Sequence, residues 1–88
     1  MKTDRQMERH FKGVSNHHRI NILLFVKKHP KVTLDQITAE LKGNFKTISE
    51  HTRKLVQAGL LTKEYKGRNV EHSLSPYGEK IALFIKSF

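Results

Sequence analysis

The chain has 88 residues, which is enough for one domain with a single modest core. No apolar run approaches the roughly 18 residues needed to cross a bilayer. It has no cysteine, which excludes disulfides and cysteine-bound metals, and its charged N-terminus leads into no apolar signal region, so we expect a cytoplasmic protein. Seventeen Lys and Arg against eight Asp and Glu give a net charge of +9, which favours a polyanionic partner: DNA, RNA or an anionic membrane surface.

The first predicted helix covers residues 4–12 and stops at Gly13. Its apolar contacts are Met7 and Phe11, which share a face because they are four residues apart.

The second predicted helix covers residues 17–28, after a capping residue at Ser15 or Asn16. Its centre is apolar almost all round, so periodicity alone would also allow a buried strand. The cap, the two lysines at its C-terminal end and Pro30 beyond it favour a helix buried at the centre of the fold.

A capping-box pattern, Thr33 with Gln36, opens the third predicted helix. Leu34, Ile37 and Leu41 share its apolar face, and a turn at residues 42–43 follows.

The fourth predicted helix covers residues 45–58, between Asn44 as N-cap and Gly59 just beyond its C-terminus. At about 100° per residue, one face is apolar and is expected to pack on the core: Phe45, Ile48, Thr52, Leu55 and Val56. The opposite face is polar and partly cationic: Lys46, Glu50, Arg53 and Gln57. Such a helix can lie on a globule and enter a groove, although an ordinary solvated helix has the same pattern.

Residues 60–65 and 70–74 predict two strands joined by a turn at residues 66–69, with Lys66 and Arg68 at the tip. After Pro76, a hydrophobic stripe predicts a terminal helix: Ile81, Phe84, Ile85 and Phe88.

The run LKGNFKTISEHTRKLVQAGLLTKEYKGRNVEHSLS resembles the recognition helix and wing of ArsR-like and MarR-like winged-helix regulators, and HRINILLFV resembles the helix that precedes their helix-turn-helix. The resemblance covers about residues 14–78 and is sharpest at Thr47, Ile48, Ser49, His51, Lys54, Leu55, Ala58, Gly59 and Leu60. Thr52 departs from it, because this family usually has an apolar residue there, which would seat the recognition helix less tightly. The cysteine pair of many ArsR-like sensors is absent, so their thiolate metal sensing does not carry over.

The resemblance and the element order predict a mainly α fold with a small β-hairpin: a winged helix-turn-helix of about five helices and a two-stranded wing, in a single domain over residues 1–88. The implied function is sequence-specific binding of double-stranded DNA by a transcription regulator, as a repressor and a homodimer. The residues expected at DNA are Asn44, Lys46, Thr47, Ser49, Glu50, Arg53, Lys54, Lys63, Lys66 and Arg68. Residues 76–88 are the expected dimerisation element, and the residues expected to serve dimerisation are Met7, Phe11, Ile81, Phe84, Ile85 and Phe88.

Catalysis finds little support, because no phosphate-binding loop and no acid–base pair is evident, so we expect neither an enzyme nor a cofactor. The six histidines lack the i, i+4 spacing of a helical metal pair and are expected at helix surfaces or facing DNA. A zinc or nickel site shared across a dimer, built from His17, His18 or C-terminal groups, stays open, as does a small-molecule effector. The alternative function is a winged helix that binds protein or RNA without sequence-specific DNA recognition.

Overall fold

A computed structural model describes all residues, 1–88. Its elements in chain order are α1 (Asp4–Val14), α2 (His17–Lys28), β1 (Val32–Thr33), α3 (Leu34–Leu41), α4 (Phe45–Gln57), β2 (Leu61–Lys66), β3 (Asn69–Leu74) and α5 (Pro76–Lys86). The predicted five helices and hairpin wing are confirmed. No helix is both long enough and apolar enough to span a membrane.

The helices begin where the caps predict. Asn16, rather than Ser15, caps α2 by accepting from the amide of His18, and Thr33 and Gln36 form the predicted capping box ahead of α3. The helix α1 is two residues longer than predicted, because Gly13 continues it to Val14. Gly13 is buried there, and a Cβ on it would lie 2.2 Å from the Cβ of Ala58, so a glycine allows α1 to pack closely.

The sheet has three antiparallel strands in the order β1-β3-β2, which corrects the expectation of a hairpin alone. The added strand is only two residues long, and Val32 pairs with His72. It forms because the chain between α2 and α3 runs along the free edge of β3, a long-range pairing that leaves no periodic signal in two residues.

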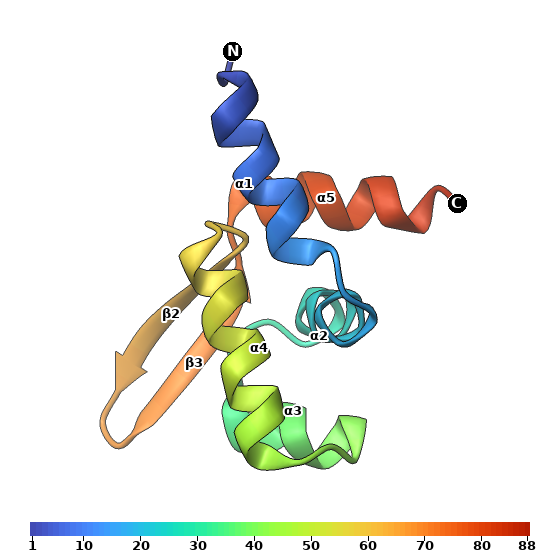
Figure 1. Cartoon of the computed structure of the whole chain (residues 1–88). Helices are drawn as coiled ribbons and strands as arrows, with labels where there is room; N and C mark the ends of the chain where they lie inside the picture. The colour runs from blue at the N-terminus through green and yellow to red at the C-terminus, as the bar shows by residue number, and fades with distance from the viewer.

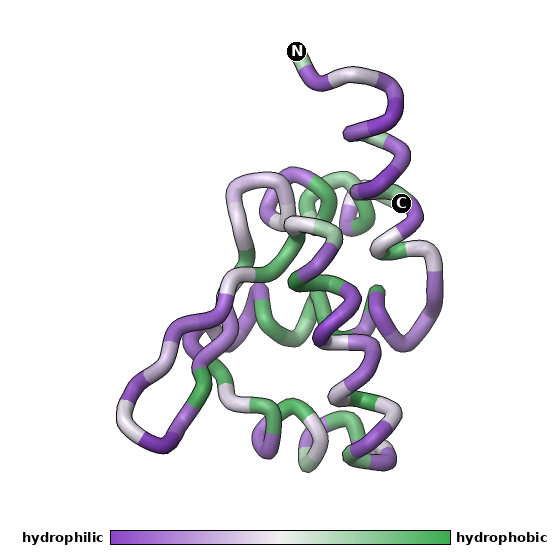
Figure 2. The backbone as a smooth tube through the Cα atoms, turned by 60° about the vertical axis from the view of Figure 1, so that its left-hand side comes forward, coloured by the Kyte–Doolittle hydropathy of each residue, from purple (hydrophilic) through white to green (hydrophobic).

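The core surrounds α2, whose buried apolar side chains Ile22, Leu23 and Val26 confirm the prediction of a central helix. In Figure 1, α1 and α5 lie at one end of the molecule, and α3 with the beginning of α4 lies at the other. The hairpin extends sideways from the body. Figure 2 shows mainly hydrophilic residues along the outer part of α1 and around the hairpin tip, and hydrophobic segments inside the body.

Candidate nucleic-acid interface

The helix α4 divides into a buried and an exposed face, as its sequence predicts. Ile48, Thr52 and Leu55 are buried, whereas the polar face is open to solvent along its whole length: Lys46, Glu50, Arg53 and Gln57. The prediction that Phe45 packs on the core is wrong, because its side chain is 52% exposed. It is the first residue of the helix, and its ring lies on the flank of α4 rather than over the core.

Thr52, which stands where the resembling family usually has an apolar residue, leaves no polar atom unpaired. Its side chain is buried, and its hydroxyl donates a 2.8 Å hydrogen bond to the carbonyl of Ile48 one turn earlier. At the N-terminus of α4, the side chain of Asn44 accepts from the amide of Thr47 at 3.2 Å, so Asn44 is the N-cap that the sequence predicts.

The other end of α4 is held by α1. The last carbonyls of a helix lack partners within it. Arg9 donates to the carbonyl of Gln57, from Nε at 3.1 Å and from its terminal nitrogen, and His10 Nδ1 lies 2.7 Å from the carbonyl oxygen of Ala58. Because a carbonyl only accepts, this ring nitrogen carries the proton. The first helix therefore caps α4.

A side-chain pair also joins α2 to the middle of α4. Arg19 Nε donates to His51 Nδ1 at 3.1 Å, and the Arg19 guanidinium reaches the carbonyl of Gly13 at 3.3 Å. Burial lowers the pKa of His51, and the nearby charge of Arg19 lowers it further. The neutral ring that results is the form that can accept from Arg19.

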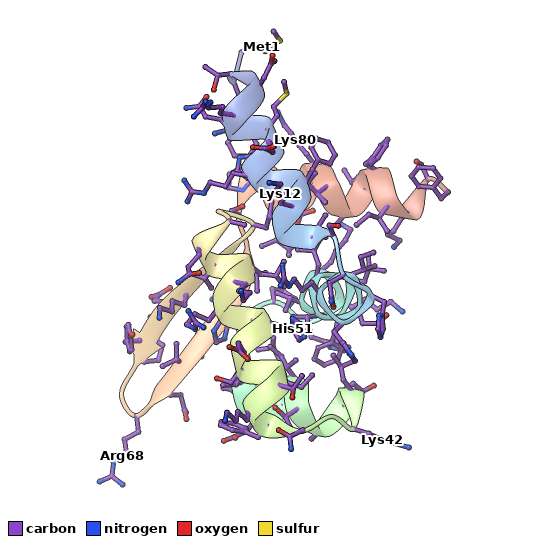
Figure 3. The ribbon with its side chains drawn as sticks, in the orientation of Figure 1. Met1, Lys12, Lys42, His51, Arg68 and Lys80 are labelled. Carbon is purple, nitrogen blue, oxygen red and sulfur yellow. The ribbon has the colours of Figure 1, made fainter.

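The wing is the hairpin of β2 and β3, with Lys66 paired to Asn69 and two residues between them. Gly67 has φ +62 at the first of these positions, as a type II′ turn requires. Arg68 at the tip projects away from the body (Figure 3), and Lys66 pairs with Glu64 at 2.9 Å on the open surface. The hydrogen bond and the charges of that pair raise the pKa of Lys66 and lower the pKa of Glu64.

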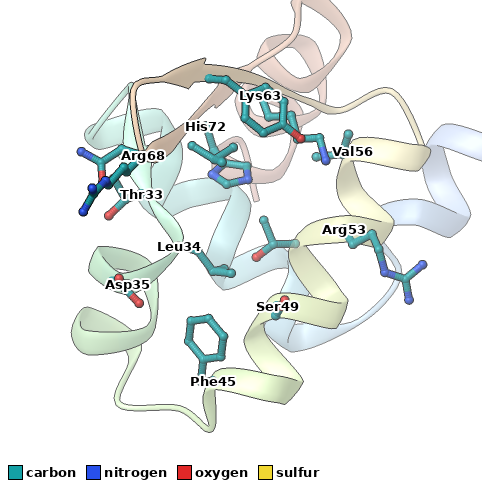
Figure 4. Close-up of a pocket in the computed structure, with 14 residues that line it drawn as sticks. Thr33, Leu34, Asp35, Phe45, Ser49, Arg53, Val56, Lys63, Arg68 and His72 are labelled. Atoms are coloured by element: carbon teal, nitrogen blue, oxygen red, sulfur yellow. The ribbon is translucent and has the colours of Figure 1, made fainter.

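Between α4, the beginning of α3 and the wing lies a cavity of about 330 Å³, which we call the helix–wing groove (Figure 4). Its apolar lining includes Leu34, Phe45 and Val56. Its charged lining consists of three cations, Arg53, Lys63 and Arg68, and one carboxylate, Asp35. The groove therefore combines a partly apolar floor with positive charge supplied by both α4 and the wing.

The residues expected at DNA do not all lie together. Four of them line the helix–wing groove: Ser49, Arg53, Lys63 and Arg68. Asn44 and Thr47 line a separate hollow beside His18 on the other flank of α4. The remainder are exposed outside both hollows: Lys46, Glu50, Lys54 and Lys66. Glu50 and Arg53 form an exposed ion pair at 3.7 Å, so Glu50 can orient Arg53.

The residues expected in dimerisation fall into two groups. Ile81 is buried in the core and Ile85 packs against it, so neither is a free surface residue. The others leave apolar surface on α1, on α5 and at the C-terminus: Met7 is half-buried, and Phe11, Phe84 and Phe88 are exposed. Met7 and Phe11 also line a hollow of about 310 Å³ between α1 and α5. Leu83 of α5, which has no place in the predicted stripe, is also exposed.

Two histidines are buried, although the histidines are expected at helix surfaces or facing DNA. His10 is buried against Ala58, and its ring stacks on Tyr77 with centroids 4.9 Å apart. His72 is buried under the sheet, with Nδ1 3.3 Å from the carbonyl oxygen of Val32. The spacing of these histidines in the sequence does not reveal that they are buried, because each is buried by contacts with residues 40 or more positions away along the chain. The rings of His17 and His18 lie 4.0 Å apart, and no group of three or more His, Asp or Glu side chains is placed to hold a metal ion.

Comparison with known proteins agrees with this geometry. The family described as winged helix DNA-binding domain matches residues 16–78. HlyU from Vibrio cholerae N16961 superposes with a TM-score of 0.87 at 17% identity, covering 99% of this chain and 96% of that one. The transcriptional repressor PagR of Bacillus anthracis gives 0.85 at 23% identity, with coverages of 92% and 93%. A comparison with curated proteins gives no match.

A third solved structure is a homodimeric winged helix-turn-helix DNA-binding domain from Mycobacterium bovis, a possible ArsR-family transcriptional regulator. It superposes with a TM-score of 0.84 at 18% identity, covering 99% of this chain and 86% of that one. The predicted resemblance to ArsR-like regulators is thereby confirmed at the level of the fold. With a family match over most of the sequence, the identification is direct: the chain belongs to the winged helix DNA-binding domain family.

Proposed function

We propose that this protein is a transcription regulator that binds double-stranded DNA sequence-specifically, as a homodimer and a repressor. In this proposal α4 enters the major groove and the wing contacts the adjacent backbone. The observation that carries the proposal is the shared geometry of α4 and the wing. Arg53 from the helix and Lys63 and Arg68 from the hairpin all line one groove on one side of the molecule.

The chemistry of α4 supports base reading. Arginine can donate two hydrogen bonds to O6 and N7 of a guanine, and Arg53 is exposed with an adjacent carboxylate to orient it. Lys66 and Arg68 lie on a two-residue turn at the wing tip, where contact with phosphates is the expected role. A helix of this kind cannot enter the deep, narrow major groove of an RNA duplex, which favours DNA.

The homodimer is supported by α1 and α5. Phe11, Phe84 and Phe88 leave apolar surface exposed at the end of the molecule opposite the beginning of α4. A two-fold interface there would cover this surface and present two recognition helices about 34 Å apart, which implies a palindromic site. A regulator of this prokaryotic type acts in the cytoplasm, and no enzymatic activity belongs to the proposal.

One observation favours a second candidate, a protein-docking module. Phe45 and Tyr65 are exposed aromatic side chains beside the helix–wing groove, and such residues can anchor a protein partner. The cations beside them, Arg53, Lys63 and Arg68, favour a polyanion over an apolar protein surface.

The test is selection of binding sites from random duplex DNA, followed by titration of the selected and a scrambled duplex at several salt concentrations. If about 6 phosphates are contacted per dimer, the slope of log K against log salt should be near −5. The selected duplex should bind more tightly than the scrambled one at every salt concentration. Equal affinity for both, or no dependence on salt, would contradict the proposal and leave the protein-docking candidate.

A further inference from the structure

Phe45 is the one large apolar side chain of α4 that the core does not cover. It is the first residue of the helix, directly after the N-cap Asn44, and 52% of its surface is exposed. Figure 4 shows its ring at the helix–wing groove, near Leu34 of α3 and on the same side of α4 as Ser49. An exposed aromatic ring can supply apolar contact area to a binding partner.

Dimerisation through α1 and α5 does not supply that partner. Those helices lie at the opposite end of the molecule from the beginning of α4, as Figure 1 shows. A second copy seated on Phe11 and Phe84 would leave Phe45 exposed. Its partner must therefore approach from the side of the recognition helix and the wing.

The charges around Phe45 indicate what that partner is. Lys46 follows it in the sequence, and the same groove is lined by three cations, Arg53, Lys63 and Arg68, and by one carboxylate, Asp35, so the charged groups of the groove are positive on balance. In a DNA major groove, the first residues of a recognition helix reach the base edges. Those edges carry hydrogen-bonding groups and one apolar group, the C5 methyl of thymine, which phenylalanine contacts favourably.

We infer that Phe45 is a specificity-determining residue that reads a thymine through its C5 methyl group. The inference rests on the proposed function, because it requires α4 to lie in a major groove. It assigns to Phe45 a base-reading role that hydrogen-bonding residues of the same helix, such as Arg53, cannot perform. It also predicts a thymine within the part of each half-site that faces the beginning of α4.

The experiment replaces each thymine of the selected duplex in turn by deoxyuridine, which removes only the methyl group. Wild type and Phe45→Ala are titrated against the full set. At one position of each half-site, the loss of the methyl should weaken wild type by about fourfold, the value for one buried methyl-sized group. At that position Phe45→Ala should bind the thymine and deoxyuridine duplexes equally.

Two further variants separate a loss of thymine recognition from a loss of protein stability. Phe45→Leu keeps an apolar contact and should keep part of the sensitivity to deoxyuridine, even if both substitutions lower the melting temperature. Lys46→Ala, a neighbouring exposed residue, should weaken binding to all duplexes and keep the full sensitivity. A purely structural role for Phe45 would weaken binding without changing the ratio between thymine and deoxyuridine duplexes.

The outcomes distinguish the two proposals. If wild type does not prefer the selected duplex, the proposed function fails. If it does prefer that duplex, but no thymine in it is sensitive to loss of its methyl, or Phe45→Ala keeps the sensitivity, the thymine reading is overturned and the proposed function stands. A selected site without thymine would overturn the reading as well.

Discussion

The two ends of the molecule differ in what they expose. Six of the eight exposed large hydrophobic residues belong to the N-terminal region and to residues 76–88, which contain α5: Met1, Phe11, Tyr77, Leu83, Phe84 and Phe88. The helix–wing side exposes only Phe45 and Tyr65, and these lie among cationic side chains. Since the hydrophobic effect drives apolar surfaces together and cations attract polyanions, the difference suggests separate roles: self-association at one end and DNA contact at the other.

The same comparison shows how the two ends are joined. Arg9 and His10 of α1 cap the C-terminal carbonyls of α4, and Gly13 packs against Ala58 directly after it. The C-terminal end of α4 is thus fixed by a helix of the proposed dimerisation region. A dimer built on α1 would therefore set the orientation of both copies of α4.

The largest effect should follow from placing a charge on the apolar end. Phe84→Asp should raise the dimer dissociation constant at least a hundredfold, because burial of one large side chain contributes about 1.5–3 kcal/mol and a two-fold interface contains it twice. Sedimentation equilibrium measures the change. Phe84 is exposed in the protomer, so the protomer should stay folded. Deleting the whole of α5 is a poor test, since Ile81 belongs to the core.

Phe45→Asp is the matched control. Phe45 is exposed to nearly the same extent as Phe84, at 52% against 54%, but lies at the other end of the molecule. The control should leave the dimer dissociation constant unchanged and weaken DNA binding. If both variants dissociate the dimer equally, or neither does, the separation of roles between the two ends is wrong.

The next effect concerns the junction between the two ends. Gly13→Ala should lower the free energy of unfolding by about 3 kcal/mol, because its Cβ would lie 2.2 Å from the Cβ of Ala58 and α1 would have to move away from α4. Urea denaturation measures this directly. The comparison is Gly67→Ala at the wing tip, where no atom lies within 4 Å and only the positive φ opposes a side chain. That variant should lose about 1 kcal/mol. Equal losses would contradict the close packing at Gly13.

Within the end proposed to contact DNA, α4 and the wing should behave differently. Arg53→Ala should cost about 1–3 kcal/mol on the selected duplex and relax discrimination at one base position. Lys66→Ala should weaken all duplexes alike and lower the salt slope by about 1 per site. Titrations of the selected and scrambled duplexes at two salt concentrations separate the two patterns. If Arg53→Ala weakens both duplexes equally while Lys66→Ala changes neither, this placement of helix and wing on DNA is wrong.

The smallest effect is a dependence of stability on pH at the root of the wing. Burial lowers the pKa of His72 from its ordinary value of 6.5, against the opposing effect of its hydrogen bond with Val32. The folded state then binds fewer protons than the unfolded state, so the stabilisation is full above pH 6.5 and is lost as the pH falls towards the lowered pKa. His72→Asn should flatten that part of the curve of unfolding free energy against pH. A steeper curve in the variant would contradict this assignment.

Much of the fold follows from local sequence signals. The caps at Asn16, Thr33 and Asn44 set where three helices begin, and the polar face of α4 is where the helical period places it. These features depend on residues a few positions apart, so a sequence contains them in full.

The missed features depend on distant contacts. The short strand β1 exists only because β3 lies beside it, and His10 is buried only because α1 crosses the end of α4. Along α5 a single hydrophobic stripe divides between Ile81, in the core, and Phe84, in solvent, because the core covers only part of the helix. Phe45 has a core-like position by periodicity, but α4 begins beyond the edge of the core.

The central claim is that the position of the positive charge, rather than its amount, directs DNA to α4 and the wing. Two double variants test it: Arg53→Ala with Lys66→Ala, and Arg5→Ala with Lys28→Ala. Each removes one arginine and one lysine, so each lowers the net charge from +9 by two, to +7. All four side chains are exposed, and Arg5 and Lys28 form no ion pair.

The measurement is the affinity of each variant for the selected duplex as a function of salt concentration. The first pair of substitutions should lower the affinity about tenfold or more and reduce the salt slope by about 2 to 4 per dimer, whereas the second pair should change the slope little. Equal losses from both pairs would contradict the central claim, because binding would then follow the net charge of the protein and not the geometry of its recognition helix and wing.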